Sequence, residues 1–385
     1  MNGGFAMERP LGRIGGDPML LGSLFLIVGI GVAGLYSASY GYAISLGKSG
    51  SYFALRQFIW LAPAAAMFAL GAFVPLGFVQ RMIGAFVLGA FVLLVLPFMP
   101  VIGITKNGAS RWFGFAGQMF QPSELFKPVL VLYLAHILSK KAEKLADVVN
   151  GVIPPLIVAV LGVLIVLAQN DFSTALLLGI LAMVMFWIAD VSMAFFAAIA
   201  SIGLPLAALS VLTSGYRLKR VLGFLAPGYD PADLSYQVTG SMRAIGSGGL
   251  WGKGLGQGTL KLRSIPLVQS DFVFAAWAEE TGFAGVAVFF GLWAFFLWRA
   301  FRASFMAPDA FRSHMAFGMA CYLGFQTLVN VMVASGAVPA TGIPLPFFSA
   351  GGSSLISVSL AAGFLFNVSR SAARAYDGER NEANA

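Results

Sequence analysis

Apolar runs of about 20 residues recur along the whole chain and are separated by short polar stretches. A run of this length crosses the hydrocarbon core of a bilayer as a helix, so each run predicts a membrane span. The pattern therefore predicts an all-α polytopic membrane protein with about ten transmembrane helices. The spans are expected at roughly residues 18–40, 58–76, 82–100, 123–139, 151–168, 172–190, 193–213, 271–298, 313–337 and 349–369.

One polar segment, residues 214–270 between the seventh and eighth spans, is much longer than the others. Apolar residues recur at helical spacing from Leu218 to Leu225 and again from Leu234 to Ile245. This spacing predicts two short helices at the membrane surface. A membrane protein seldom keeps so long a loop without using it, because the backbone must find partners outside the lipid. We therefore expect the loop to carry function.

Composition agrees with a membrane class. The chain of 385 residues is 58% hydrophobic and only 10% charged, whereas soluble domains are roughly 25% charged. We interpret residues 18–370 as one membrane domain, flanked by polar tails (1–17 and 371–385) that we expect to be disordered. The single cysteine, Cys321, excludes a disulfide framework. The net charge of +8 does not indicate a nucleic-acid partner.

Positive charge differs between alternate loops. If the N-terminus is cytoplasmic, the inward segments carry twelve Lys and Arg residues and the short outward loops carry four. By the positive-inside rule, both termini are then cytoplasmic and the 214–270 loop is extracytoplasmic. The inward cations are Arg9, Arg13, Arg81, Lys140, Lys141, Lys144, Arg299, Arg302, Arg312, Arg370, Arg374 and Arg380, and the outward ones are Lys48, Arg56, Lys106 and Arg111.

The large loop departs from this charge rule. It would keep seven cations on the outer side, namely Arg217, Lys219, Arg220, Arg243, Lys253, Lys261 and Arg263. An anionic ligand would explain them, and so would attraction to anionic lipid headgroups. Residues 246–258 of the loop contain seven glycines. They match no nucleotide-binding pattern, so we expect a flexible connection or a close backbone approach to a ligand, with N–H groups available for an anion.

A lone carboxylate, Asp271, lies where this loop meets the eighth span. An acid at such a boundary is a functional candidate. Glu279 and Glu280 lie about two turns further into the span, where a buried carboxylate is costly unless it is paired or hydrated. At least one of the two is expected to face a cavity or a cation, and we include both among the candidate substrate-binding residues.

The segment Gln121–Lys127, at the start of the fourth span, is a second polar region. Ser123 is positioned to cap the helix, and Glu124 in the first turn complements the helix dipole. Lys127 lies one turn from Glu124, which leaves two alternatives. The two residues form a structural ion pair, or Lys127 lines a polar cavity that faces the large loop and binds substrate.

Other chemistries lack the residues that they need. The two histidines, His136 and His314, are isolated near the cytoplasmic ends of spans, so a Ser/His/Asp triad is nearly excluded. His, Cys and acidic residues do not cluster at metal-ligand spacing, so a structural zinc site is not expected. Asp171 lies at the start of the sixth span and is explained by exposure at a helix end.

Short motifs spread over residues 17–370 resemble the SEDS family of cell-wall polymerases, which includes FtsW and RodA. Each motif is weak alone, but their order along the chain makes the resemblance specific. The motifs are Tyr36-Ser37-Ala38-Ser39, Arg56-Gln57, Asn107-Gly108 with Arg111-Trp112, Phe120–Leu125 with Lys127, Gln169 with Asp171, Tyr236-Gln237, Gly246–Leu250, Asp271–Ala275, Glu279-Glu280, Gly342–Phe347, Ser349 and Gly351–Ser354.

The sequence departs from the family pattern at a few positions. Leu267-Val268-Gln269-Ser270 stands where the family usually has a glutamate followed by His-Thr, which removes one loop carboxylate. Asn170-Asp171 replaces the more usual Pro-Asp. Arg56-Gln57 and Tyr236–Thr239 are closer to the division member FtsW, whereas Gly342–Pro346 is closer to RodA. On balance the motifs slightly favour the FtsW branch.

The resemblance implies a glycosyltransferase that joins lipid II units and releases undecaprenyl pyrophosphate, with Asp271 as the essential carboxylate. Asp271 would take the proton of the attacking hydroxyl. Gln121, Ser123, Glu124 and Asp171 are assigned structural roles. Cations near the loop would meet the pyrophosphate, namely Arg111, Arg217, Arg220, Arg243, Lys261 and Arg263.

The resemblance also suggests a divalent cation, Mg²⁺ or Mn²⁺, beside these charges. It implies a place in the bacterial cytoplasmic (inner) membrane, with a class B penicillin-binding protein and divisome or elongasome proteins as partners. Two alternatives stay open, a lipid II flippase and a non-catalytic scaffold for a penicillin-binding protein. A flippase would need a polar route to both faces of the membrane, whereas the long loop is concentrated on one side.

Overall fold

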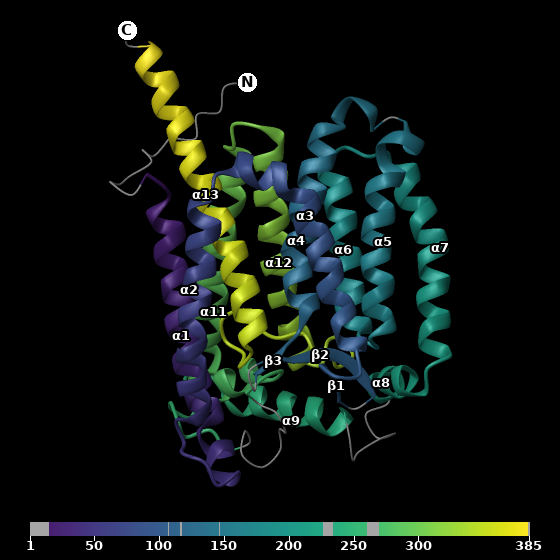
Figure 1. The fold of residues 1–385 in the computed structure, drawn as a ribbon. Coiled ribbons are helices and arrows are strands. Elements are labelled where there is room, and N and C mark those ends of the chain that lie inside the picture. Colours follow the sequence, from purple (N-terminus) through teal and green to yellow (C-terminus); the bar gives the residue numbers. More distant parts are fainter. Residues whose placement is uncertain are drawn as a thin grey trace.

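The computed structural model describes residues 15–106, 108–115, 118–145, 147–225, 234–259 and 269–383. Within these ranges, ten helices of at least 16 residues run side by side and form a bundle (Figure 1). They are α1 (Pro18–Ser45), α2 (Tyr52–Phe73), α3 (Leu76–Val95), α4 (Pro122–Lys140), α5 (Ile153–Ala168), α6 (Phe172–Ile188), α7 (Met193–Leu212), α11 (Val273–Phe305), α12 (Ala310–Ala334) and α13 (Gly352–Ala383). Each coincides with one predicted span, so the predicted fold class is confirmed.

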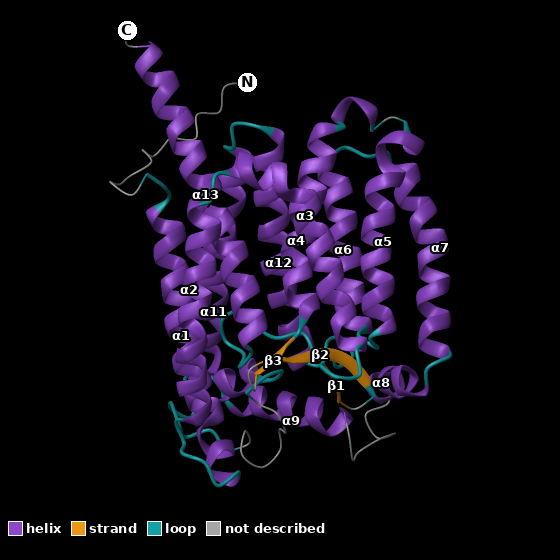
Figure 2. Ribbon diagram, viewed as in Figure 1, coloured by secondary structure: helices purple, strands orange, loops and turns teal. Residues whose placement is uncertain are grey.

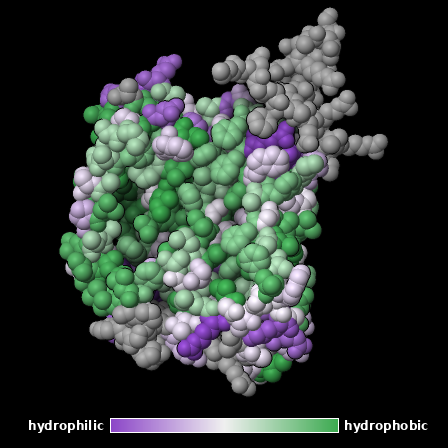
Figure 3. All heavy atoms as spheres, turned by 180° about the vertical axis from the view of Figure 1, so that it is seen from behind, coloured by the Kyte–Doolittle hydropathy of each residue, from purple (hydrophilic) through white to green (hydrophobic). Residues whose placement is uncertain are grey.

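Eight helices of the described chain are long and apolar enough to cross a membrane. Two others are shorter or more polar, since α6 has 17 residues and α4 carries Glu124 and Lys127. The face shown in Figure 3 is apolar across its middle, with hydrophilic residues gathered at the two ends. Helices with exposed apolar side chains between polar ends are typical of a protein in a bilayer.

The most buried helices lie in the middle of the bundle. In α12 and α13 most residues of the apolar segment are buried, whereas α7 at the edge of the bundle is almost entirely exposed (Figure 1). Because the interior of the bundle excludes both lipid and water, polar side chains inside it need protein partners. This requirement decides where the buried charges described below are placed.

The chain termini and the large loop lie at opposite ends of the bundle (Figure 1). At the loop end lie the two short helices that the sequence predicts, α8 (Gly215–Leu225) and α9 (Leu234–Ser247). At the other end α13 continues as a helix to Ala383. The expectation of a disordered tail after residue 370 is therefore wrong for residues 371–383, while residues 1–14 lie outside the described chain.

A small antiparallel sheet at the loop end was not predicted (Figure 2). Its strands are β1 (Gly103–Lys106), β2 (Ala109–Phe115) and β3 (Gln118–Phe120), in the order β1-β2-β3. Gly108 has a φ of +74°, which suits the tight hairpin between β1 and β2. In the described parts of the chain, the remaining helical elements are single turns at Leu96–Phe98, Ala142–Lys144 and Val148–Val152.

Helix α11 is interrupted inside the membrane domain at Gly282, where the backbone leaves the helical conformation (φ 62°, ψ −164°). The glycine-rich segment of the loop packs against this break. Phe283 and Ala284 donate their N–H groups to the carbonyls of Gly249 (2.8 Å) and Leu250 (3.0 Å). These bonds replace helical bonds that the break removes, which a membrane interior requires.

Candidate functional site

Asp271 lies two residues before α11, at the same end of the bundle as α8, α9 and the sheet. Side chains from α12 and from the segment between α12 and α13 hold its backbone. Asn330 on α12 donates its amide to the carbonyl of Asp271 (3.0 Å), and the Ser349 hydroxyl donates to the carbonyl of Ser270. Ala350 also donates its N–H to the carbonyl of Gln269 (2.8 Å). The chain on both sides of Asp271 is therefore fixed against the bundle.

The Asp271 side chain is half-buried, and its surroundings change its acidity. Burial raises the pKa of Asp271 to about 6, because loss of water disfavours the charged carboxylate. A hydrogen bond from Ser270 and the positive charges of Arg220 and Arg111 act in the opposite direction and limit the rise in pKa. A carboxylate that is ionised at pH 7 but binds a proton near pH 6 is suited to general-base work.

Two of the predicted arginines thus act electrostatically on Asp271. Arg220 extends from α8 and donates to the carbonyl of Ala340 (3.1 Å), in the segment between α12 and α13. Arg111 extends from β2 and donates to the carbonyl of Asn170 (2.5 Å), and its guanidinium lies 3.6 Å from the carboxylate of Asp171. The site therefore joins elements that are far apart in the sequence.

The turn between α5 and α6 positions Arg111. Asn170 has a left-handed backbone (φ 60°) and donates its side-chain amide to the carbonyl of Gly108 (2.8 Å), in the hairpin that carries Arg111. Asparagine tolerates this conformation, whereas proline is restricted to φ near −65°. In this chain, Asn170, which replaces the proline of the family pattern, adopts a backbone conformation that proline cannot adopt and uses its side chain to hold the hairpin.

Asp171 and Gln121 form a structural link beside this turn. The explanation of Asp171 by exposure at a helix end is wrong, because its side chain is buried. It accepts from the N–H of Thr174 (3.3 Å) and so caps α6. It also accepts from Gln121 (3.0 Å), whose amide donates to the Ser123 hydroxyl as well (3.1 Å). The expectation that Ser123 caps α4 is wrong, because α4 begins at Pro122 and the residue at the cap position is Gln121.

The other predicted loop cations lie differently. Arg217 donates to the carbonyl of Ser210 (3.2 Å) and its guanidinium lies 5.4 Å from the ring centre of Phe172. Arg243 on α9 has an exposed side chain. Lys261 and Arg263 lie outside the described residues. Of these four cations, Arg217 lies against the bundle and Arg243 is exposed.

Lys127 is completely buried. Its ammonium donates to Glu124 (2.7 Å) and to the side-chain carbonyl of Gln326 (2.6 Å), and it lies 5.1 Å from the ring centre of Tyr322. The geometry is that of the structural ion pair, extended by Gln326. The geometry does not match the alternative, in which Lys127 lines a polar cavity that faces the loop, because the side chain is fully buried in this structure.

Glu279 and Glu280 are also buried, and both hold the glycine-rich segment. Glu279 accepts from the Lys253 ammonium (2.8 Å) and from the N–H of Thr259 (3.0 Å). Glu280 accepts from the Ser37 hydroxyl (2.5 Å), which in turn accepts from the N–H of Gly256 (3.0 Å). The expectation of a cationic partner is met at Glu279, and these contacts anchor the loop.

The glycine-rich segment packs closely against the backbone of α11. Lys253 and Gly254 donate their N–H groups to the carbonyls of Glu279 (3.1 Å) and Glu280 (2.9 Å). A Cβ atom on Gly252 would lie 2.1 Å from the carbonyl oxygen of Glu280, so only glycine fits. The close approach that the structure shows is to the backbone of α11, and the N–H groups of residues 253 and 254 already donate to its carbonyl groups, so these two are not available to an anion.

The sequence did not predict three features of this region: the hydrogen bond from Asn330 to the backbone of Asp271, the helix break at Gly282, and the hydrogen bond from Ser349 to the backbone of Ser270. Asn330 is, with Gln326 and Thr327, one of few polar residues in the middle of its span, and this feature marks it as a candidate in the sequence. Gly282 lies in a span that also holds Gly285 and Gly291, so the sequence does not single out its broken backbone. Ser349 belongs to a family-like motif, but its contact with Ser270 joins residues 79 positions apart.

The donors around Asp271 do not fit a divalent cation. In the described parts of the chain no group of three or more His, Cys, Asp or Glu side chains is placed to hold a metal ion. The charged groups that influence Asp271 are the arginines at 111 and 220, which repel a cation. The site of the described residues is thus built for an anion.

Comparison with known proteins agrees with this organisation. A family model for FtsW, RodA and SpoVE, described as "Cell cycle protein", matches residues 18–374. A probable peptidoglycan glycosyltransferase FtsW of Geobacter sp. (strain M18) is 36% identical over 363 residues, which cover 92% of this chain and 97% of that protein.

Solved structures are similar over the same length. A chain from work on the structural coordination of polymerization and crosslinking by a peptidoglycan synthase complex superposes with a TM-score of 0.77, at 28% identity, over 93% of this chain and 98% of that chain. The crystal structure of the rod shape determining protein RodA of Thermus thermophilus superposes with a TM-score of 0.69, at 28% identity, over 93% and 98% of the two chains.

Proposed function

The chain belongs to the FtsW/RodA/SpoVE family, and from this membership and the site we infer that it is a peptidoglycan glycosyltransferase with Asp271 as its general base. The observation that carries the role of Asp271 is its setting. It is a half-buried carboxylate with a pKa of about 6, fixed through its backbone beside two arginines. Among the predicted site residues that the structure describes, Asp271 alone combines a partly exposed side chain with a pKa of about 6.

The proposed substrate is lipid II. In the reaction, a sugar hydroxyl attacks the anomeric carbon of a lipid-linked glycan, the glycosidic bond to the pyrophosphate breaks, and undecaprenyl pyrophosphate leaves. Asp271 accepts the hydroxyl proton as the new bond forms, which makes the hydroxyl a competent nucleophile. Its fixed backbone would keep the carboxylate at the attacking oxygen and so lower the entropic part of the barrier.

The leaving pyrophosphate needs positive charge. Arg220 and Arg111 are the first candidates, because both are close enough to Asp271 to affect its pKa and both are held by backbone carbonyls. Fixed cations of this kind stabilise charge that develops in the transition state. Arg217, Arg243, Lys261 and Arg263 are proposed as further phosphate contacts along the loop. No step is assigned to a divalent cation, since the described donors do not suit one.

The chain is a multi-pass membrane protein, and we propose that it lies in the bacterial inner membrane with both termini in the cytoplasm. The loop end, with Asp271, then faces the extracytoplasmic side, where a penicillin-binding protein would crosslink the new glycan. A structural relative belongs to a peptidoglycan synthase complex, which supports such a partner. The FtsW relative favours division over elongation as the setting.

Purified protein supplied with lipid II in detergent tests the proposal, because detergent removes the two compartments that a flippase needs. We expect glycan polymer from the parental protein, and about 10²–10⁴-fold less from Asp271→Asn, which keeps the shape but removes the base. Asp271→Glu should recover little, because the added methylene displaces the carboxylate by roughly 1 Å. Gel filtration checks that both variants fold.

Polymer formed by Asp271→Asn at close to the parental rate would assign the base to another residue. A parental protein that binds lipid II and its penicillin-binding partner but forms no polymer would favour the flippase or the scaffold.

A further inference from the structure

Asn330 joins two segments of the chain that are far apart in the sequence. It lies near the last turn of α12 and is only 1% exposed. Its side-chain amide donates to the carbonyl of Asp271 (3.0 Å) and to the carbonyl of Ile343 (2.9 Å). A side-chain amide has two N–H donors, so both are engaged in this bridge. The backbone of Asp271 is therefore tied to residue 343 through a single buried side chain.

The segment at the other end of this bridge, residues 343–349, is fixed by its own contacts, and we call it the bracing segment. Gln326 on α12 donates to the carbonyl of Pro344 (3.0 Å). Phe347 has a left-handed backbone (φ 65°), and its ring stacks on Trp293 of α11 with 6.4 Å between the ring centres. A residue other than glycine keeps such a φ only where its surroundings determine it. The bracing segment thus gives the bridge a fixed end.

Ser349, the last residue of the bracing segment, forms a second link to the same stretch of backbone. Its hydroxyl donates to the carbonyl of Ser270 and accepts from an N–H within the segment (2.8 Å). The neighbouring Ala350 donates its N–H to the carbonyl of Gln269 (2.8 Å). Each of residues 269–271 is therefore held through its carbonyl group.

We propose that Asn330 and Ser349 are positioning residues for the polymerisation reaction, an inference that rests on the role proposed above for Asp271. Neither side chain is proposed to touch substrate. By holding the backbone of Asp271 to the bracing segment, they keep its carboxylate in a fixed place beside Arg111 and Arg220. A displacement of roughly 1 Å at a reacting group costs about 10²-fold in rate. The two residues thus act on the rate through the position of Asp271.

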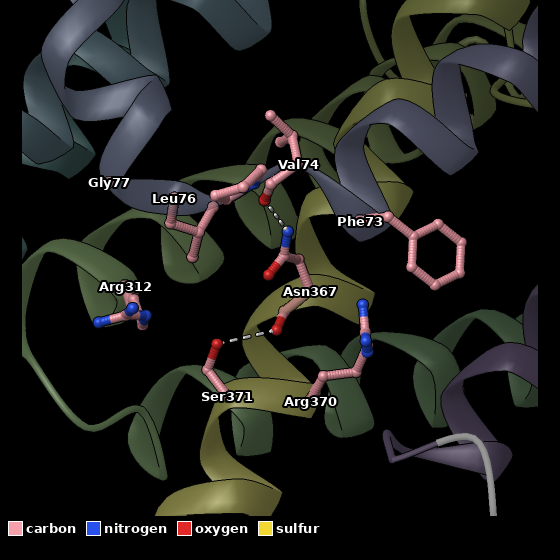
Figure 4. A pocket seen from close by; sticks show the side chains of 9 residues that line it. Phe73, Val74, Leu76, Gly77, Arg312, Asn367, Arg370 and Ser371 are labelled. Atoms are coloured by element: carbon pink, nitrogen blue, oxygen red, sulfur yellow. Dashed lines mark hydrogen bonds between the residues drawn. The ribbon is translucent and has the colours of Figure 1, made fainter.

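Asn367 on α13 makes the same kind of bridge at the opposite end of the bundle, and it provides a matched control. Its amide donates to the carbonyls of Gly71 (2.8 Å) and Val74 (2.9 Å), and the residue is buried. Figure 4 shows the bond to Val74, in a pocket where the turn between α2 and α3 meets α13. This bridge lies on the side of the termini, away from Asp271 (Figure 1). Loss of either amide removes two buried hydrogen bonds, but only Asn330 acts on the candidate base.

Initial rates with purified protein and lipid II in detergent test the proposal. Asn330→Leu keeps a side chain of similar size and removes both donors. We expect kcat to fall about 10²-fold while KM stays within about twofold, because the position of the base is lost and not the binding of substrate. Asn367→Leu should lower the unfolding temperature to a similar extent and keep the parental kcat. An equal fall in kcat in both variants would mean general destabilisation and would overturn the proposal, as would a parental kcat in Asn330→Leu.

Ser349→Ala guards against misfolding of Asn330→Leu, because it removes only the hydroxyl group. It should lower kcat about tenfold, with KM close to the parental value and a smaller effect on the unfolding temperature. A parental kcat in Ser349→Ala would overturn the proposal even if Asn330→Leu does not fold.

Hydrogen exchange gives a readout that does not depend on glycan synthesis. The N–H of Ala350, which donates to the carbonyl of Gln269, should exchange faster in Asn330→Leu and Ser349→Ala than in the parental protein. Asn367→Leu should leave this exchange unchanged. Unchanged exchange in the first two variants would overturn the support of the backbone, and faster exchange with a parental kcat would overturn the effect on the reaction. An inactive parental protein would instead overturn the proposed function, so the two failures are distinguishable.

Discussion

Asp271 combines a partly exposed side chain with a pKa close to physiological pH. Burial raises its pKa to about 6, and the two arginines keep it from rising further. A base must be ionised to accept a proton. The balance therefore leaves Asp271 ionised at pH 7 while it retains more basicity than an ordinary aspartate.

This pKa sets the pH dependence of the reaction. Below about pH 6 Asp271 is protonated, so the rate of polymerisation should fall about tenfold for each further pH unit, and above about pH 7 it should level off. Initial rates with lipid II in detergent measure this profile. Asp271→Asn serves as the control, since its residual rate should not show the acidic limb. The same limb in Asp271→Asn would assign the titration to another group.

Lys127 lies in a buried network that we expect to act on stability. Lys127→Met would leave the carboxylate of Glu124 buried without its counter-ion, which typically costs about 3–5 kcal/mol. The double variant Glu124→Gln with Lys127→Met removes both charges and should recover most of that loss. Thermal unfolding in detergent measures both variants.

The exchange Glu124→Lys with Lys127→Glu is the sharper control. It should restore the parental stability only in part, because the carbonyl of Gln326 that accepts from Lys127 would then face a carboxylate. Equal stability of Lys127→Met and the double variant would contradict the role of the ion pair. If Glu124→Gln with Lys127→Met restores stability but the protein no longer polymerises lipid II, Lys127 returns to the substrate-binding candidates.

At the scale of elements, the glycine-rich segment and the break in α11 form one unit. Gly252 and Gly282 both have positive φ, and a Cβ on Gly282 would lie 2.3 Å from the backbone nitrogen of Gly252. Lys253 and Gly254 close the unit by hydrogen bonds to α11. Because α11 begins two residues after Asp271, this unit sets the position of the helix that follows Asp271.

Gly252→Ala and Gly282→Ala should therefore disrupt the unit. Each combines an unfavourable φ with a backbone clash, so we expect a loss of a few kcal/mol in stability and lower polymerisation. Gly246→Ala is the matched control, because Gly246 is helical and a Cβ there meets no atom within 4 Å. Limited proteolysis of the loop and thermal unfolding report the effect. Parental behaviour of both variants would mean that the segment is not a fixed element.

The same elements show what the sequence can and cannot predict. The ten long helices and α8 and α9 follow from apolar spacing, which reflects burial directly. The sheet was missed although Asn107-Gly108 is a strong hairpin signal, because its short strands carry little apolar alternation. Asp271 was predicted from its boundary position. Its supports were not, since Asn330 and Ser349 meet residues 269–271 only through the packing of distant segments.

At the scale of the whole molecule, charge and function are divided between the two ends of the bundle. The candidate base and its arginines lie at the loop end, and the termini, Arg312 and Arg370 lie at the other (Figure 1). We propose from the positive-inside rule that the second end lies in the cytoplasm. The proposed reaction requires the same orientation, because it takes lipid-linked substrate on the extracytoplasmic face.

This orientation can be measured with single cysteines in a Cys321→Ala background, which removes the only native thiol. Lys219→Cys on α8 and Lys144→Cys in the turn Ala142–Lys144 replace exposed side chains at opposite ends. Lys253 is less suitable because its ammonium pairs with Glu279. In intact spheroplasts an impermeant maleimide should label the cysteine at 219, and the cysteine at 144 only after permeabilisation. The reverse pattern would place Asp271 in the cytoplasm, on the wrong face for glycan assembly, and would end the polymerase proposal.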